Sequence, residues 1–185
     1  MKKWIPLVLV IGMLSWAIYD FIDSNNKNQT ENVEKDVESE AEEAVIGLNV
    51  GDKAPDFQLE TLAGDSVKLS DFHGKQVMIN FWATWCPPCR AEMPDMVKFD
   101  QDKDIVVLAV NLTDSETSLE DVENFADEYE LTFPVLLDVN LDVATLYAIK
   151  PIPTTYMVDS NGLISYKAFG AMNYDLMVQE FEKMD

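Results

Sequence analysis

The sequence predicts an α/β fold in which buried strands alternate with helices. Two near-continuous apolar runs, at 77–82 and 105–110, have the pattern of strands that are covered on both faces of a largely parallel sheet. Helical periodicity separates the predicted strands, and the chain closes with a strand hairpin and a helix. The 185 residues are 48% hydrophobic and include only 2 cysteines. This composition suits one globular domain with an additional segment and excludes a disulfide-stapled miniprotein.

The first half of the domain is expected to contain a hairpin, two buried strands and a helix. Alternating apolar residues at 57–60 and 67–69, on either side of a Leu-Ala-Gly-Asp turn, predict a peripheral hairpin. A helix over 88–100 then connects the two buried strands, and Pro94 removes one of its internal hydrogen bonds.

The second half begins with an amphipathic helix. Ser118 and Asp121 resemble a capping box and predict a helix that runs to Tyr129. Its expected apolar face consists of Leu119, Val122, Phe125 and Ala126. The elements expected after it are a strand at 135–137, a helix at 141–148, a strand at 154–158, a turn at 159–162, a strand at 163–169 and a helix at 173–183.

Residues 1–22 have the features of a membrane anchor. Lys2 and Lys3 precede an uncharged run that is just long enough to span roughly 30 Å of hydrocarbon. Because the first charged residues after this run are acids, the positive-inside rule predicts a single-pass protein of the cell membrane whose domain is extracytoplasmic. We prefer a retained signal anchor to a cleaved signal peptide or a buried core helix. A polar, Glu-rich stretch then predicts an acidic flexible linker over 23–47, followed by the domain at 48–185.

The charge balance limits the classes of partner. With 13 basic and 34 acidic residues, the formal net charge is -21. Such a chain repels phosphate backbones, so nucleic acid is not expected as a partner. The sequence provides no argument for an oligomer, and we expect a monomer.

The two cysteines form a Cys86-Pro87-Pro88-Cys89 motif just beyond the buried strand, at the start of the next helix. A purely structural disulfide is one alternative, but closing so short a loop stabilises a fold by only about 2 kcal/mol. A zinc site is a second alternative. A closed zinc site needs four ligands, and besides the two cysteines the chain has only one histidine, His73. Redox catalysis is therefore preferred, and neither a metal nor another cofactor is expected.

The helix assigns different roles to the two thiols. Cys86 lies at the helix N-terminus, where the dipole favours a thiolate, so it is the expected nucleophile. Cys89, one turn further along and more buried, would resolve the mixed disulfide. Glu92 is three residues after Cys89 and could accept its proton if burial raises the pKa of the carboxyl. The alternative is a solvated glutamate that only complements the helix dipole.

Several motifs together resemble one family. They are Phe81-Trp-Ala-Thr-Trp-Cys-Pro-Pro-Cys-Arg90, Glu92, Pro94, Phe133-Pro-Val-Leu-Leu-Asp138 and Ile152-Pro-Thr-Thr155. The domain closely resembles the ResA/TlpA-like, membrane-anchored thioredoxin-fold thiol-disulfide oxidoreductases. The resemblance implies a thioredoxin-like fold: a central mixed sheet flanked by helices, with an N-terminal hairpin and a TlpA-type central insertion near 112–138.

The resemblance also implies further site residues. The Ile152-Pro153 peptide bond would be cis and face the active site, where the Ile152 backbone can pair with an extended substrate. Trp85 and Pro87 are the other candidate substrate contacts, with packing as the alternative for the tryptophan. Asn80 stands where thioredoxins have a buried acid, which moves the proton-transfer role to Glu92.

The leading functional hypothesis is an extracytoplasmic protein-disulfide reductase that a membrane electron donor keeps reduced. Its expected substrates are disulfides of apocytochrome c or of spore-envelope proteins. A disulfide oxidase or isomerase would use the same residues, because the reduction potential sets the direction. A peroxiredoxin is disfavoured because Cys86 lacks the preceding Pro and Thr/Ser pattern. The alternative outside enzymology is a copper- or haem-handling module.

Overall fold

The computed structural model describes residues 45–184. The predicted anchor at 1–22 and most of the predicted linker at 23–47 lie outside this range. Among the described residues, no helix combines the length and the apolar composition of a membrane span.

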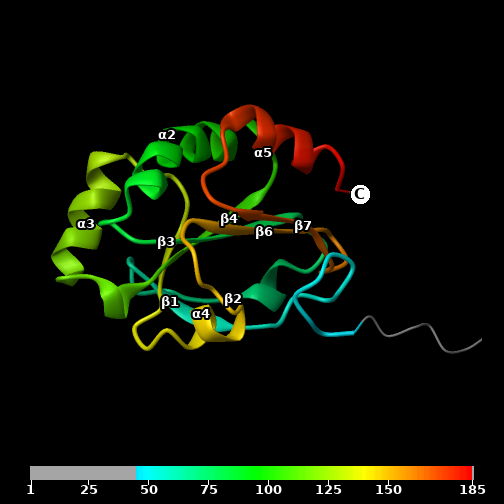
Figure 1. The fold of residues 1–185 in the computed structure, drawn as a ribbon, viewed down its shortest axis with the longest axis horizontal. Coiled ribbons are helices and arrows are strands. Elements are labelled where there is room, and N and C mark those ends of the chain that lie inside the picture. The colour runs from blue at the N-terminus through cyan, green and yellow to red at the C-terminus, as the bar shows by residue number, and fades with distance from the viewer. Residues whose placement is uncertain (1–44, 185) are drawn as a thin grey trace, which may run out of the picture. The chain divides into compact units, whose positions relative to one another are not determined.

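A seven-stranded mixed sheet with the order β2-β1-β5-β4-β3-β6-β7 forms the centre of the described domain (Figure 1). Its strands are β1 (Gln58–Thr61), β2 (Ser66–Lys68), β3 (Val77–Trp82), β4 (Val106–Asn111), β5 (Val135–Leu137), β6 (Thr154–Val158) and β7 (Ile164–Phe169). Strands β3, β4 and β5 are parallel, and the remaining neighbours pair antiparallel. The predicted α/β class with a mixed sheet is confirmed.

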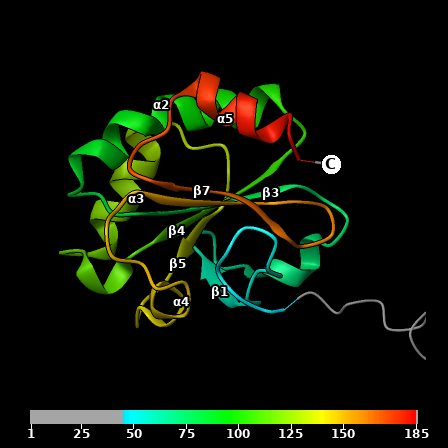
Figure 2. The same cartoon turned by 45° about the vertical axis from the view of Figure 1, so that its right-hand side comes forward.

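The helices are distributed over both faces of this sheet (Figures 1 and 2). They are α2 (Pro87–Asp102), α3 (Leu119–Glu128), α4 (Asp142–Leu146) and α5 (Tyr174–Phe181), with short 3-10 turns η1 (Leu69–Phe72) and η2 (Thr113–Ser115). Helices α2 and α5 lie side by side on one face, and α4 lies on the other.

Two apolar clusters, one on each face of the sheet, hold these layers together. All of β3 is buried, and each of its apolar residues belongs to one cluster or the other. The cluster under α2, α3 and α5 is rich in methionine and contains the cysteine pair; its methionines are Met78, Met93, Met96, Met157, Met172, Met177 and Met184. Flexible thioether side chains fill irregular spaces in a core.

Most elements occur where the sequence predicts them, with shifted ends. Strand β3 has the predicted limits, β4 starts and ends one residue later than predicted, and α2 continues past Pro94 to Asp102.

The prediction that Leu119 belongs to the buried face of α3 is wrong, since this residue is 44% exposed. The face that packs on the sheet is centred on Val122 and Phe125. Because each residue turns a helix by about 100°, Leu119 lies about 90° from the centre of that face.

The sheet register brings three loops together at one end. Trp82, the last residue of β3, pairs with Asn111, the last residue of β4. Phe81 pairs with Thr154, the first residue of β6. The loop that leads into α2, the loop after β4 and the loop before β6 therefore meet at the same edge of the sheet.

Candidate active site

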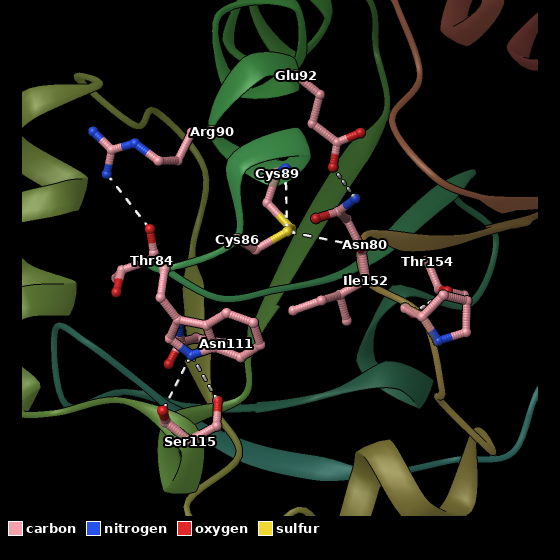
Figure 3. Close-up of a disulfide and its surroundings, with 12 residues drawn as sticks. Asn80, Thr84, Cys86, Cys89, Arg90, Glu92, Asn111, Ser115, Ile152 and Thr154 are labelled. Atoms are coloured by element: carbon pink, nitrogen blue, oxygen red, sulfur yellow. Dashed lines mark hydrogen bonds between the residues drawn. A yellow bond between two sulfur atoms is a disulfide. The ribbon is translucent and has the colours of Figure 1, made fainter.

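Cys86 and Cys89 form a disulfide at the N-terminus of α2 (Figure 3). Pro87 and Pro88 occupy the first helical positions, where the missing N–H groups leave no intrahelical bond unmade. Cys86 is the N-cap residue, and its Sγ accepts a hydrogen bond of 3.2 Å from the Cys89 backbone N–H. This bond and the helix dipole both favour negative charge on the Cys86 sulfur once the disulfide is reduced.

Cys89 is the more buried of the two cysteines, as expected, but the difference is small. Cys86 is 2% exposed and Cys89 is 0% exposed. The contacts of the Cys86 sulfur with the Cys89 N–H and with the Ile152 carbonyl distinguish it more clearly than exposure does.

The loop before β6 reaches the disulfide. The Ile152-Pro153 peptide bond is cis, as the resemblance implies. The Sγ of Cys86 lies 3.7 Å from the carbonyl oxygen of Ile152. Ile152 is half-buried and Pro153 is buried, whereas Trp85 and Pro87 are exposed beside the cysteines. The structure thus brings together the four residues predicted as substrate contacts and the disulfide.

Glu92 is a buried carboxyl on the next turn of α2 and is only 1% exposed. Its Oε1 accepts a bond of 2.9 Å from Asn80 Nδ2, and its Oε2 accepts one of 2.9 Å from the Met172 backbone N–H. Burial raises the pKa of Glu92 from 4.5 to about 7, although the two hydrogen bonds act in the opposite direction. The alternative of a solvated glutamate is therefore wrong, and the condition for proton transfer near neutral pH is met.

Asn80 completes this buried polar group on β3. Its Nδ2 also donates to Thr155 Oγ1 at 3.0 Å, while its Oδ1 has no hydrogen-bond partner among residues 45–184. Figure 3 shows the Asn80 amide turned toward the Glu92 carboxyl.

Arg90 points away from the disulfide (Figure 3). Its guanidinium pairs with Glu128 at 3.2 Å and lies over the rings of Phe125 and Tyr129. Its Nη1 also lies 3.5 Å from the Thr84 carbonyl oxygen, in the loop before α2. Among the described residues, Arg90 therefore contacts α3, Tyr129 and this loop rather than the Cys86 sulfur.

The loop after β4 also contributes residues to this region, and none of them is predicted from the sequence. Glu116 accepts hydrogen bonds from Thr84 and Asn111, and Ser115 accepts one from the Trp85 indole. The available signal was a run of polar residues at the carboxyl end of a buried parallel strand, where sites commonly form in α/β folds.

Metal ligation has no support in the described residues. His73 lies in the loop before β3, at the opposite end of that strand from Cys86. Within 45–184, no three His, Cys, Asp or Glu side chains are placed to hold a metal ion.

Comparison with known proteins places this geometry in context. The AhpC/TSA family matches residues 50–167, a range that includes the cysteine pair, Glu92 and Ile152-Pro153. Thioredoxin-like protein YneN of Bacillus subtilis is 37% identical over 187 residues, which cover 98% of each chain. Thiol-disulfide oxidoreductase ResA of Oceanobacillus iheyensis is 47% identical over 133 residues, or 68% of each chain. The crystal structure of StoA from Bacillus subtilis superposes with a TM-score of 0.62 at 28% identity, covering 69% of this chain and 96% of that one.

Proposed function

This chain belongs to the AhpC/TSA family and is a thioredoxin-fold thiol-disulfide oxidoreductase, and we propose that it acts as an extracytoplasmic protein-disulfide reductase. One observation carries the proposal: the disulfide at the start of α2 lies against the Ile152 carbonyl, with a buried carboxyl one turn away. This arrangement provides a nucleophile, a resolving thiol and a proton acceptor beside a backbone segment that can bind an extended peptide.

The reaction transfers two electrons from the dithiol to the substrate. The Cys86 thiolate attacks one sulfur of a substrate disulfide, and the other substrate sulfur leaves as a thiolate. Cys89 then attacks the Cys86 sulfur of the mixed disulfide, which releases the second substrate thiolate and forms the Cys86–Cys89 disulfide. Glu92 accepts the Cys89 proton for this second step, since a pKa of about 7 leaves it partly ionised near neutral pH.

The substrate binds beside the buried pair, on the surface where Trp85 and Pro87 are exposed. Its backbone pairs with Ile152, next to Pro153, and its side chains contact Trp85 and Pro87. The exposure of Trp85 and Pro87 and the short distance between Ile152 and the Cys86 sulfur support this arrangement.

The domain organisation in this proposal is an anchor at 1–22, an acidic linker at 23–47 and the catalytic domain at 48–185. The basic residues before the apolar run support a single-pass protein of the cell membrane with an extracytoplasmic domain. The proposed state is a monomer. A membrane donor of the thiol-reducing type returns two electrons per cycle. The substrates are protein disulfides, with apocytochrome c and spore-envelope proteins as the candidate classes.

The direction of electron flow is tested in living cells by acid quenching, alkylation with a mass tag and a gel shift. We expect the Cys86–Cys89 pair to be mostly reduced. A mostly oxidised pair would contradict the reductase and favour an oxidase or isomerase. Metal analysis of anaerobically purified protein tests the copper- or haem-handling alternative.

A trapping experiment tests the roles of the two thiols. Cys89→Ser should accumulate mixed disulfides with cellular substrates, because the resolving thiol is missing, whereas the matched Cys86→Ser should accumulate none. Non-reducing gels before and after dithiothreitol measure this difference. Equal trapping by the two variants would contradict the assignment of Cys86 as the nucleophile and Cys89 as the resolving thiol.

A further inference from the structure

The loop 83–86 carries Trp85 and Cys86 from β3 into α2, and it has few bonds of its own. Within the loop, the Cys86 N–H donates to the Ala83 carbonyl at 3.2 Å. Residues outside the loop bind the Thr84 N–H, hydroxyl and carbonyl, the Trp85 indole and the Cys86 carbonyl. The position of the nucleophile therefore depends on the neighbouring segments.

Glu116 provides much of this support from the segment after β4. Its Oε1 accepts bonds from the Thr84 backbone N–H at 2.7 Å and from Asn111 Nδ2 at 2.8 Å. Its Oε2 accepts a short bond from the Thr84 hydroxyl. No Lys or Arg pairs with Glu116 among the described residues. A half-buried carboxylate that binds three neutral donors forms charge-assisted bonds, which are stronger than neutral ones.

The neighbouring Ser115 holds the indole of Trp85. The Trp85 Nε1–H lies 3.1 Å from the Ser115 carbonyl oxygen and 3.2 Å from its Oγ, and that hydroxyl donates to the Leu112 carbonyl at 2.6 Å. Trp85 is nevertheless 56% exposed. An exposed aromatic side chain that is already held in one position loses little conformational entropy when it contacts a partner.

We propose that Glu116 is a positioning residue, which holds the loop 83–86 so that Trp85 and Cys86 present one fixed surface to a protein disulfide. It touches neither sulfur and acts through Thr84, so it is not a catalytic residue. The substrate part of this inference rests on the proposed reductase function. The proposal predicts that Glu116 matters for protein substrates, which contact Trp85, more than for small disulfides, which need only the sulfur.

The test compares Glu116→Ala with Glu123→Ala in the full-length chain in detergent micelles. Glu123 is an exposed glutamate of α3, so its replacement removes the same charge without breaking the network. Insulin is the protein disulfide and oxidised glutathione the small one. For Glu116→Ala we expect KM for insulin to rise at least about tenfold, with kcat unchanged, because three donors lose their acceptor and the loss of one acceptor alone is of that order. The rate with oxidised glutathione should stay within about twofold.

A conservative variant separates positioning from a general loss of structure. In Glu116→Gln, the remaining oxygen can accept from the Thr84 N–H and from Asn111, and the amide can donate to the Thr84 hydroxyl. The KM for insulin should therefore return most of the way to the wild-type value. Equal losses with insulin and oxidised glutathione, or no loss with either, would overturn the proposal.

A measurement that does not depend on the direction of electron flow keeps the two proposals distinguishable. In the oxidised protein, hydrogen exchange of the Thr84 amide and the Trp85 indole N–H should be slow in the wild type and in Glu116→Gln, and fast in Glu116→Ala. If the wild type fails to reduce insulin, the reductase proposal fails. Unchanged exchange in Glu116→Ala contradicts the positioning role instead.

Discussion

Replacing Glu92 by glutamine should make the stability of the protein less dependent on pH. Because burial raises the pKa of Glu92 from 4.5 to about 7, the folded protein keeps a proton on this carboxyl that the unfolded chain has already released. The folded state therefore loses stability as pH rises from about 4.5 to about 7, and the loss is complete above 7. The gap between the two pKa values corresponds to about 3 kcal/mol.

Glu92→Gln removes this ionisation while preserving the size of the side chain. At pH 8 the variant should gain about 3 kcal/mol of unfolding free energy from the ionisation term, and at pH 5 it should gain less than about 1 kcal/mol. The Oδ1 of Asn80, unpaired within 45–184, offers an acceptor to a neutral side chain if the Asn80 amide turns over. Any change in hydrogen bonding alters the unfolding free energy of the variant by the same amount at every pH. The test is therefore how the difference between variant and wild type changes from pH 5 to pH 8.

The assay is urea unfolding of the oxidised protein from pH 5 to pH 8.5, followed by far-UV circular dichroism. The cysteines do not titrate in the disulfide form, and the other ionisable groups cancel between wild type and variant. Glu123→Gln, at an exposed position, is the control and should follow the wild type throughout. If the wild type and Glu92→Gln differ by the same amount at pH 5 and pH 8, Glu92 ionises at its ordinary pKa and the argument for its role as proton acceptor fails.

Two further predictions concern residues around the site. Arg90→Gln should lower stability by about 1 kcal/mol, because it removes a partly exposed ion pair with Glu128 and the cation–π contacts with Phe125 and Tyr129. It should leave the pH profile of Cys86 alkylation unchanged, and a displaced profile would show that the guanidinium acts on the thiol. Ser118→Ala should lower the unfolding free energy by about 1 kcal/mol, since the Ser118 Oγ caps α3. Thermal unfolding measures this loss, with Thr117→Ala, at an exposed neighbouring position, as the control. Equal melting temperatures for Ser118→Ala and Thr117→Ala would show that the Ser118 cap does not stabilise the protein.

The buried environment of Glu92 supports its proposed role as a proton acceptor. The carboxyl lies under the sheet-facing side of α2 and receives two neutral donors, so its charged form is neither solvated nor paired with a cation among the described residues. A group in this situation exchanges protons near neutral pH, where resolution of a mixed disulfide needs a proton acceptor.

The local features of this protein could be predicted from neighbouring residues. The apolar run at 77–82 specified β3 with its limits, and Ser118 specified the start of α3. The spacing of Cys86 and Cys89 at a helix start indicated redox chemistry. Each of these inferences depends on residues within a few positions of one another, and periodicity or capping chemistry encodes them directly.

The environment of each site residue was decided by tertiary structure. Glu92 is bonded by residues 12 and 80 positions away, and the Cys86 sulfur meets a carbonyl 66 positions away. Arg90 and Glu116 also have partners that are distant in the sequence. Arg90 pairs with Glu128 of α3, and Glu116 accepts a hydrogen bond from Thr84, 32 positions before it. The sequence alone determined the fold class, the order of the elements and the identity of the dithiol. Only the folded sheet determined which carboxyl is buried and which holds the active-site loop, because desolvation and hydrogen bonding depend on segments that the register of the strands brings together.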